Sequence, residues 1–339
     1  MAENAPPQDG PTPDGGPSTS GVVPTILERL RCPSCGGTMS DLAEAPGVVC
    51  AEGHRFLRRN GVLDLSAPVA RSGSTERTFA SFGYEWNTFE DVRGEDEGFA
   101  KVYFRDVDLA GLAGKVGLDA GCGKGRYTRF LAPHLAAEVA LDGSTAAEAA
   151  ARNLAGFPGV VVVRSDLRDA PFAPESFDFI SSLGVLHHLD DPFAGFTDLL
   201  RLLAPKGQIL LYLYSRPEKL GVRSVALTLA TALRRITTRL SHPVLKALCT
   251  PIAALLWVTV VLPGAWGEKN RIGTLSGLPM DAYRNMPFRG LVLDTFDRLS
   301  APVEYRYIWR DLQKWFDDTG LVVDAARDES GWFVLAHRP

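Results

Sequence analysis

The chain has 339 residues, enough for one large domain with a buried core and a smaller second domain. Its formal net charge of -4 at pH 7 argues against the broad basic surface that neutralises nucleic-acid phosphates. Five cysteines are too few for a disulfide scaffold of this length, and the N-terminus lacks the features of a secretory signal, so we expect a cytoplasmic protein.

The first 24 residues are rich in proline, glycine, serine and threonine. A segment with so few large apolar side chains cannot bury enough surface to offset the entropy of ordering, so we expect 1–24 to be a disordered tail. A compact segment with its own cysteines follows at 25–68.

Four potential metal ligands lie in two pairs within 25–68. Two turn glycines follow the first pair, and another glycine precedes the histidine of the second. Three thiolates and an imidazole suit a tetrahedral zinc ion, and four protein ligands leave no open coordination position. We therefore predict a structural zinc site, with four reduced, metal-free side chains as the alternative. The predicted ligands are Cys32, Cys35, Cys50 and His54.

Residues 53–65 resemble the zinc ribbon of certain ribosomal RNA guanine methyltransferases and the small zinc-ribbon partners of other methyltransferases. This resemblance opens the hypothesis that the ribbon binds RNA. Residues 1–80 contain seven basic and nine acidic side chains, which argues against that hypothesis without excluding it.

A glycine-rich loop follows the first strand of an expected α/β core. The strand at 116–120 leads into Gly121, Gly123 and Gly125, which allow the backbone to approach a nucleotide-like ligand or simply form a strand-to-helix turn. The G-x-G-x-G spacing departs from the G-x-G-x-x-G pattern of dinucleotide sites. The next strand ends in Asp142, whose carboxylate can accept hydrogen bonds from both hydroxyls of a ribose.

Further strands at 160–163, 177–183 and 208–214 have the apolar runs of a parallel sheet, and polar residues follow the first two. A helix at 310–318 and strands at 321–325 and 332–337 complete the predicted fold. Before the first strand, aromatic residues cluster at 79–89, which predicts a segment packed over the binding cleft or, alternatively, a plug of the core.

Taken in order, residues 113–214 resemble the class I S-adenosylmethionine-dependent methyltransferases. The resemblance implies a Rossmann-like α/β core with S-adenosylmethionine as cofactor. It implies that the glycine loop holds the methionine end, that the acid after the second strand holds the ribose, and that 182–188 lines the methyl-transfer side. The alternative is an α/β domain whose strand-end acids are only turn residues. The implied cofactor-binding residues are Asp119, Gly121, Gly123, Gly125, Asp142, Asp166, Leu167 and Leu183.

Two adjacent histidines, His187 and His188, follow the fourth strand. An imidazole at this position can take a proton from the acceptor as the methyl group arrives, so both are candidate catalytic bases. The alternative is that one histidine caps the following turn and the other packs beneath it.

Residues 215–304 interrupt the fold between its fifth strand and its closing helix. Apolar side chains in 222–240 have the spacing of an amphipathic helix, and 216–246 contains seven basic residues and one acidic residue. We expect a helical lid over the acceptor pocket, with peripheral membrane contact through 216–262 as the alternative. The apolar run 252–262 is too short to span a bilayer, so we expect a buried helix and no transmembrane segment.

The sequence therefore predicts a tail at 1–24, a zinc ribbon at 25–68, a cofactor-binding core at 69–214 and 305–339, and a helical substrate lid at 215–304. The predicted function is methyl transfer from S-adenosylmethionine to a small, largely apolar acceptor. One alternative is a ribosomal or transfer RNA methyltransferase that binds RNA through its ribbon. Another is a non-catalytic cofactor-binding interaction protein.

Overall fold

The computed structural model describes residues 22–67, 72–89, 98, 100–218, 221–276, 280, 283–284, 286–329 and 331–339. Most of the predicted tail lies outside these residues. Val22, which we assigned to the tail, is fully buried, so the ordered chain begins no later than this residue.

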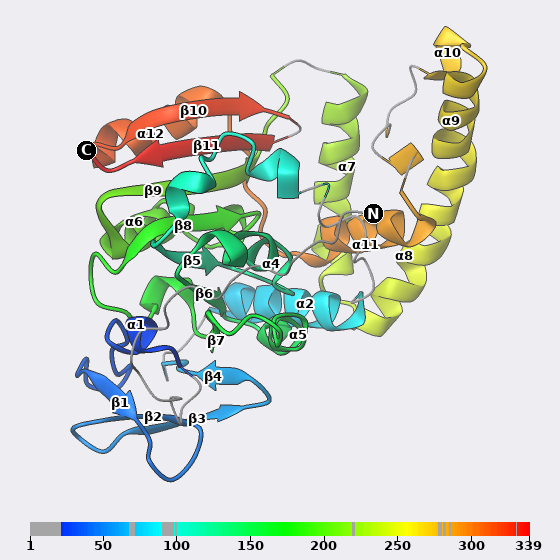
Figure 1. Ribbon diagram of the computed structural model, residues 1–339. Coiled ribbons are helices and arrows are strands. Elements are labelled where there is room, and N and C mark those ends of the chain that lie inside the picture. The colour runs from blue at the N-terminus through cyan, green and yellow to red at the C-terminus, as the bar shows by residue number, and fades with distance from the viewer. Residues whose placement is uncertain are drawn as a thin grey trace, which may run out of the picture.

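The described strands form one sheet in the order β1-β2-β3-β4-β7-β6-β5-β8-β9-β11-β10 (Figure 1). The strands from β4 to β9 in this order are parallel to one another. β11 pairs antiparallel with β9, and β10 pairs antiparallel with β11. The predicted α/β, Rossmann-like class is confirmed. The strands are β1 Met39–Asp41, β2 Gly47–Cys50, β3 Arg55–Arg59, β4 Val62–Asp64, β5 Val116–Ala120, β6 Ala137–Asp142, β7 Val160–Arg164, β8 Phe177–Leu183, β9 Leu203–Tyr214, β10 Val322–Asp328 and β11 Gly331–His337.

Helices cover both faces of the central strands. The α-helices are α1 Pro24–Leu27, α2 Gly73–Thr88, α4 Arg126–Leu131, α5 Ala146–Asn153, α6 Pro192–Leu202, α7 Val222–Thr237, α8 His242–Leu256, α9 Leu262–Lys269, α10 Gly273–Ser276, α11 Phe288–Ser300 and α12 Trp309–Thr319. Short 3-10 helices are η1 Ala110–Leu112, η2 Ala132–His134, η3 Leu167–Asp169 and η4 Leu186–His188, and η5 Trp257–Val261 is a π-helix.

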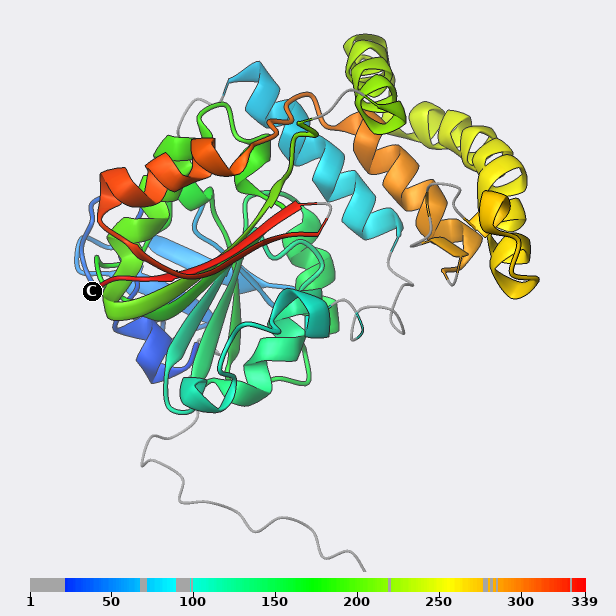
Figure 2. The same ribbon diagram turned by 90° about the horizontal axis from the view of Figure 1, so that it is seen from above.

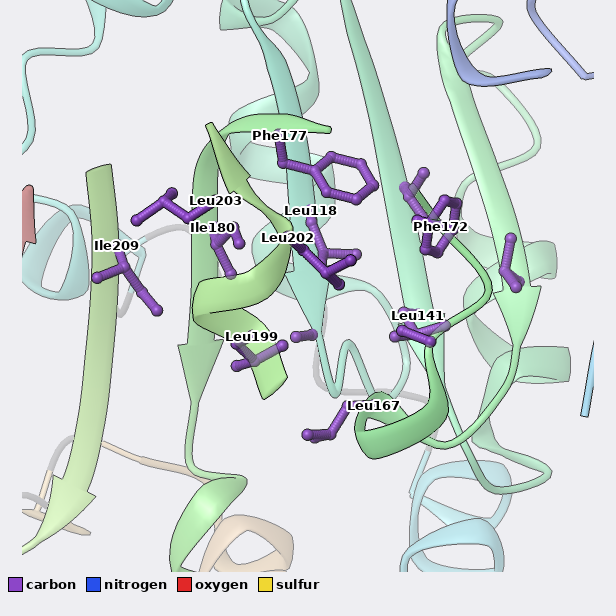
Figure 3. Packing of buried hydrophobic residues seen from close by; sticks show 14 of the residues in the cluster. Leu118, Leu141, Leu167, Phe172, Phe177, Ile180, Leu199, Leu202, Leu203 and Ile209 are labelled. Atoms are coloured by element: carbon purple, nitrogen blue, oxygen red, sulfur yellow. The ribbon is translucent and has the colours of Figure 1, made fainter. Parts of the chain in front are cut away.

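Alternate residues of the buried strands point to opposite faces of the sheet. Leu118 of β5 and Leu141 of β6 pack with Leu199 and Leu202 of α6 on one face (Figure 3). Ala140 of β6 belongs to a separate cluster with the alanines of α5 on the other face. Burial on both sides fixes the strand register and therefore places the strand ends beside one another.

The N-terminal strands continue the core sheet. β4 pairs in parallel with β7, with Val62 opposite Val162, while β1 to β3 form an antiparallel meander at the edge. Leu63 and Leu65 are fully buried in the main core. The predicted ribbon at 25–68 thus shares its last strand with the core.

The inserted helices project to one side of the sheet (Figure 2). α7 and α8 both pack on α11, and α11 packs on α2, so α2 and α11 separate them from the central strands. Among the described residues, one helical segment is long enough and apolar enough to cross a membrane, judged by length and composition alone. This segment is His242–Lys269.

The prediction that the apolar part of this segment is a short, buried helix is wrong. Pro251 lies inside α8, and Pro263 lies just after the π-helix η5, so the helical segment continues through both prolines. Only 22% of its most apolar stretch is buried.

The side chain of Glu138 on β6 is buried. Among the described residues, neither of its oxygens has a hydrogen-bond partner. Burial raises the pKa of Glu138 well above its usual range, and the nearby charge of Asp119 raises it further. Because the folded-state pKa is raised, this group makes the protein less stable as pH rises from about 4.3, the usual value of a glutamate.

We therefore expect Glu138→Met to stabilise the protein by about 1–3 kcal/mol near neutral pH, because it removes an unpaired buried polar group. Thermal unfolding across a pH series should show the gain increasing with pH. Glu138→Gln keeps the polarity and removes the ionisation, so it should remove the pH dependence with a smaller gain. A Met variant less stable than the wild type at every pH would contradict this prediction.

Candidate functional site

A cavity opens at the carboxyl ends of β5, β6 and β8, beneath α2. Its empty volume is about 840 Å³, a figure that includes space open to solvent. It is lined by Thr78, Phe79, Phe82, Trp86, Gly121, Cys122, Gly123, Lys124, Arg126, Tyr127, Leu141, Asp142, Gly143, Ser144, Ser165, Asp166, Leu167, Leu183, Gly184, Val185, His188 and Leu189.

The three glycines of the loop after β5 all have positive φ angles, which explains why the sequence has glycine there. Gly121 and Gly123 line the cavity, and a Cβ atom on Gly123 would lie 3.0 Å from the indole nitrogen of Trp86. Gly125 is the N-cap of α4 and does not line the cavity. A Cβ atom there would lie 2.7 Å from Leu154, so this glycine allows the loop to pack against the residue that ends α5.

Asp119, a predicted cofactor ligand, also lies outside the cavity lining. Its carboxylate accepts hydrogen bonds from the hydroxyls of Thr128 at 2.6 Å and Ser181 at 3.3 Å. Burial raises the pKa of Asp119 to about 6. Asp119 therefore supports the loop from beneath by joining β5 to α4 and β8.

Asp142 lines the cavity where β6 ends, as the ribose hypothesis requires. One carboxylate oxygen accepts the backbone N–H of Gly123 at 2.9 Å, and the other accepts the N–H and hydroxyl of Ser144 at 2.8 and 2.6 Å. Burial raises the pKa of Asp142, while these hydrogen bonds oppose that shift. A carboxylate has about four acceptor positions, so capacity for a ribose hydroxyl remains.

Asp166 and Leu167, predicted to contact adenine, both line the cavity after β7. The guanidinium of Arg168 holds the Asp166 carboxylate as a fork, at 3.0 Å from Nε and 2.6 Å from Nη2. This ion pair fixes the carboxylate beside the cavity. Leu183, the remaining predicted cofactor residue, lines the cavity at the end of β8.

Four cavity residues that were not singled out individually come from α2, namely Thr78, Phe79, Phe82 and Trp86. Their spacing places them on one side of the helix, and the aromatic cluster at 79–89 was the sequence signal for the three aromatic residues among them. Asp190 holds the start of this helix by accepting hydrogen bonds from the hydroxyls of Ser72, Ser74 and Thr75.

The predicted lid does not line this cavity. Among the described residues, none of those around it belongs to 215–304, and the segment that covers the cavity is α2. The insertion reaches the site through α11, which packs behind α2 (Figure 2), and through the carbonyl group of Val303, which contacts the cavity residue His188.

The two candidate histidines have different surroundings. His188 lines the cavity, and its Nδ1 lies 2.7 Å from the carbonyl oxygen of Val303. A carbonyl can only accept, so Nδ1 carries the proton and Nε2 is the ring atom that can take another. Burial lowers the pKa of His188, which keeps the ring neutral at physiological pH.

His187 is fully buried and does not line the cavity. Its ring lies 4.0 Å, centroid to centroid, from that of Tyr214, and neither ring nitrogen has a hydrogen-bond partner among the described residues. Burial lowers the pKa of His187 well below its usual range. Its position is that of a packed side chain beneath the site.

The four predicted metal ligands come together at the base of the N-terminal meander, with all their ligand atoms within 4.8 Å of one another. The sulfurs of Cys35 and Cys50 are 3.7 Å apart, and Nδ1 of His54 lies 3.6 Å from the sulfur of Cys32 and 3.3 Å from that of Cys50. Tetrahedral zinc bonds of about 2.3 Å to sulfur and 2.0 Å to nitrogen place ligand atoms roughly 3.5–3.8 Å apart. The donor set therefore suits zinc chemically, and the three separations of 3.3–3.7 Å are close to this range.

Residues 118–211 match the family described as a methyltransferase domain. A demethylmenaquinone methyltransferase of Clavibacter sepedonicus is 36% identical over 110 residues, which are 32% of this chain and 45% of the relative. A phthiotriol/phenolphthiotriol dimycocerosates methyltransferase of Mycobacterium ulcerans is 27% identical over 181 residues, 49% of this chain and 66% of the relative. The chain thus spans less than two thirds of the length of these relatives.

Among solved structures, a SAM-dependent methyltransferase from Aquifex aeolicus is similar, with a TM-score of 0.42 and 14% sequence identity over 76% of this chain and 98% of that one. The chain contains a class I methyltransferase domain together with a Cys/His cluster of the zinc-ribbon kind.

Proposed function

We propose that this protein transfers a methyl group from S-adenosylmethionine to a small, largely apolar acceptor. The observation that carries the proposal is the cavity, in which the glycine loop, Asp142 and the aromatic side of α2 converge at the carboxyl ends of the parallel strands. Ligands of open α/β sheets bind at this edge.

The residues around the cavity suit the cofactor. Asp142 would hold the ribose, and Asp166 with Leu167 would flank the adenine. Phe82 supplies an aromatic surface that favours a nearby cation such as a sulfonium. When bound, S-adenosylmethionine supplies an activated methyl group on that sulfonium.

Two observations support an apolar acceptor. Phe82, Val185 and Leu189 line the cavity together with His188, and the ring of Phe82 lies 5.0 Å from that of His188, centroid to centroid. The two curated relatives described above carry names that refer to demethylmenaquinone and to phthiotriol dimycocerosates, acceptors with large apolar parts.

His188 is the base in this proposal. The bound cofactor would supply the methyl group to the acceptor oxygen, nitrogen or carbon, with S-adenosylhomocysteine as the other product. The acceptor's proton passes to Nε2 of His188, while Val303 holds the protonated Nδ1 in place.

The Cys/His cluster completes the proposal as a structural zinc site. All four ligands would come from the protein, so the metal would hold the meander β1 to β3 together without taking part in methyl transfer.

We expect Asp142→Ala to weaken the binding of S-adenosylmethionine by about 1–3 kcal/mol, or roughly 5- to 150-fold, because a ribose hydroxyl loses its acceptor. Isothermal titration calorimetry with S-adenosylmethionine and S-adenosylhomocysteine measures this change. NAD should not bind to either protein.

Asp178→Ala is the matched control. Asp178 lies on β8 in the same sheet, but its carboxylate accepts the N–H of Val116, where β5 begins, at the opposite edge from the cavity. Cofactor affinity should be unchanged in this variant. Equal affinities in the wild type and Asp142→Ala would place the cofactor elsewhere.

The reaction itself can be tested with methyl-labelled S-adenosylmethionine and separated fractions of a cell extract. Label entering the lipid fraction, with loss of labelling in Asp142→Ala, is the expected result. Label entering RNA or protein instead would refute the apolar acceptor while leaving methyl transfer in place.

A further inference from the structure

The helix α7 exposes its apolar side. Leu229, Leu233 and Ile236, which form one stripe along the helix, are 60%, 50% and 65% exposed. Arg234, from the opposite side, is only 6% exposed. A helix packed on a soluble domain ordinarily has the reverse arrangement.

Specific contacts hold α7 in this orientation. The guanidinium of Arg234 forms an ion pair with Glu304 and donates from Nε to the carbonyl oxygen of Arg298 at 2.6 Å. Glu304 is itself buried and also pairs with Arg306. Turning the apolar stripe inward would break this buried network, so the exposure of the stripe is part of the fold.

The segment His242–Lys269 exposes a second apolar stripe. Its outer side chains are 41–64% exposed and recur every three or four residues, so they form one stripe roughly 33 Å long. Together with the stripe of α7 they make up what we call the outer apolar face. Its members are Leu229, Leu233, Ile236, Val244, Leu248, Ile252, Leu255, Val258, Leu262 and Trp266.

The opposite side of this segment is packed on the protein. Leu245 and Cys249 are buried against Phe296 and Leu299 of α11, and Ala253 is buried in a neighbouring cluster with Leu291. A helix packed lengthwise on its own domain cannot cross a bilayer without losing these contacts. The geometry therefore favours a helix that lies along a surface over one that spans a membrane.

Charge identifies what covers the face. Residues 221–276 contain seven basic side chains and one acidic side chain, in a chain whose net charge is -4; Arg234, one of the seven, is buried and paired with Glu304. Arg235, Arg239, Lys269 and Arg271 are exposed. A second copy of the chain would bring an equally basic surface against this one, whereas an anionic lipid surface is complementary to it.

We propose that the outer apolar face docks on a lipid bilayer that contains anionic lipids, with α7 and His242–Lys269 lying in the interfacial region. The apolar side chains enter the boundary between headgroups and acyl chains, and the flanking arginines contact the phosphates. The inference does not depend on the proposed methyl transfer.

The test is flotation of the full chain with vesicles of phosphatidylcholine alone and of phosphatidylcholine mixed with phosphatidylglycerol. The protein should bind the anionic vesicles at low salt and be largely released at high salt. Leu255→Glu combined with Val258→Glu should lower binding more than tenfold, because two side chains that enter the bilayer become charged. Arg235→Gln combined with Arg239→Gln should lower binding to the anionic vesicles roughly 30-fold.

Val322→Glu is the matched control, because Val322 is an exposed valine on β10, outside the outer apolar face. It should bind vesicles like the wild type. All substituted side chains are exposed, so thermal unfolding should show that each variant is folded.

Three results would overturn the proposal. The first is equal vesicle binding by the wild type and by the variant that combines Leu255→Glu with Val258→Glu. The second is a stable dimer in analytical ultracentrifugation that Val258→Glu dissociates, without vesicle binding by the wild type. The third is wild-type protein that only detergent, and neither high salt nor alkaline carbonate, removes from membranes, which would indicate a spanning helix.

Discussion

Cys50→Ser is expected to abolish zinc binding and unfold the meander β1 to β3. Purified wild-type protein should contain about one zinc ion per chain, and the variant should contain little. Metal binding contributes on the order of 10 kcal/mol in small zinc domains, far more than the few buried side chains of this meander can supply. Metal analysis by mass spectrometry and limited proteolysis of residues 39–59 measure the two effects.

Cys249→Ser is the control for this experiment. Cys249 is also a buried, reduced cysteine, but it lies on α8 and outside the Cys/His cluster. Its replacement should leave the zinc content at the wild-type level. Calorimetry should show that Cys50→Ser still binds S-adenosylmethionine, because none of the cluster residues lines the cavity. Wild-type protein purified without chelator and free of zinc would refute the assignment.

His188→Ala should lower the rate of methyl transfer by about 10²- to 10⁴-fold with little change in cofactor affinity. His188 lines the cavity with a fixed tautomer, and the variant has no group to take the acceptor's proton. The lowered pKa of His188 sets the pH dependence. Turnover of the wild type should stay constant as pH falls through about 6.5, the usual value of a histidine, and decline only below it.

His187→Ala separates catalysis from packing. His187 is as buried as His188 but packs against Tyr214 and does not line the cavity. Its replacement should lower the melting temperature and leave the turnover of the folded protein within a few-fold of the wild type. An unchanged rate in His188→Ala would mean that positioning of an already unprotonated acceptor is sufficient.

The glycine loop and strand ends could be predicted from the sequence because their signals are local. Gly121, Gly123 and Asp142 lie within 22 residues of one another, and the sheet brings the carboxyl ends of β5 and β6 together directly. The Cys/His cluster was predictable for the same reason, since ligand spacing in a short segment limits the arrangements that can close around a metal.

The insertion could not be predicted in this way. The apolar spacing of α7 identified a helix, but the side that faces inward depends on Arg234 and Glu304, which are 70 residues apart. The two histidines present the same difficulty. Val303, which fixes the ring of His188, is 115 residues away along the chain. Long-range partners decided both questions.

The pairing of β4 with β7 also affects solubility. β7 consists of four valines and an arginine, and β4 alone covers its outer edge among the described strands. If β4 separates when the meander unfolds, an apolar strand with unpaired N–H and C=O groups becomes available to other chains. Chelated protein should then aggregate in a concentration-dependent manner even though its cavity is intact. Zinc supply would thereby control the abundance of the protein in a cell and leave the turnover of each remaining molecule unchanged.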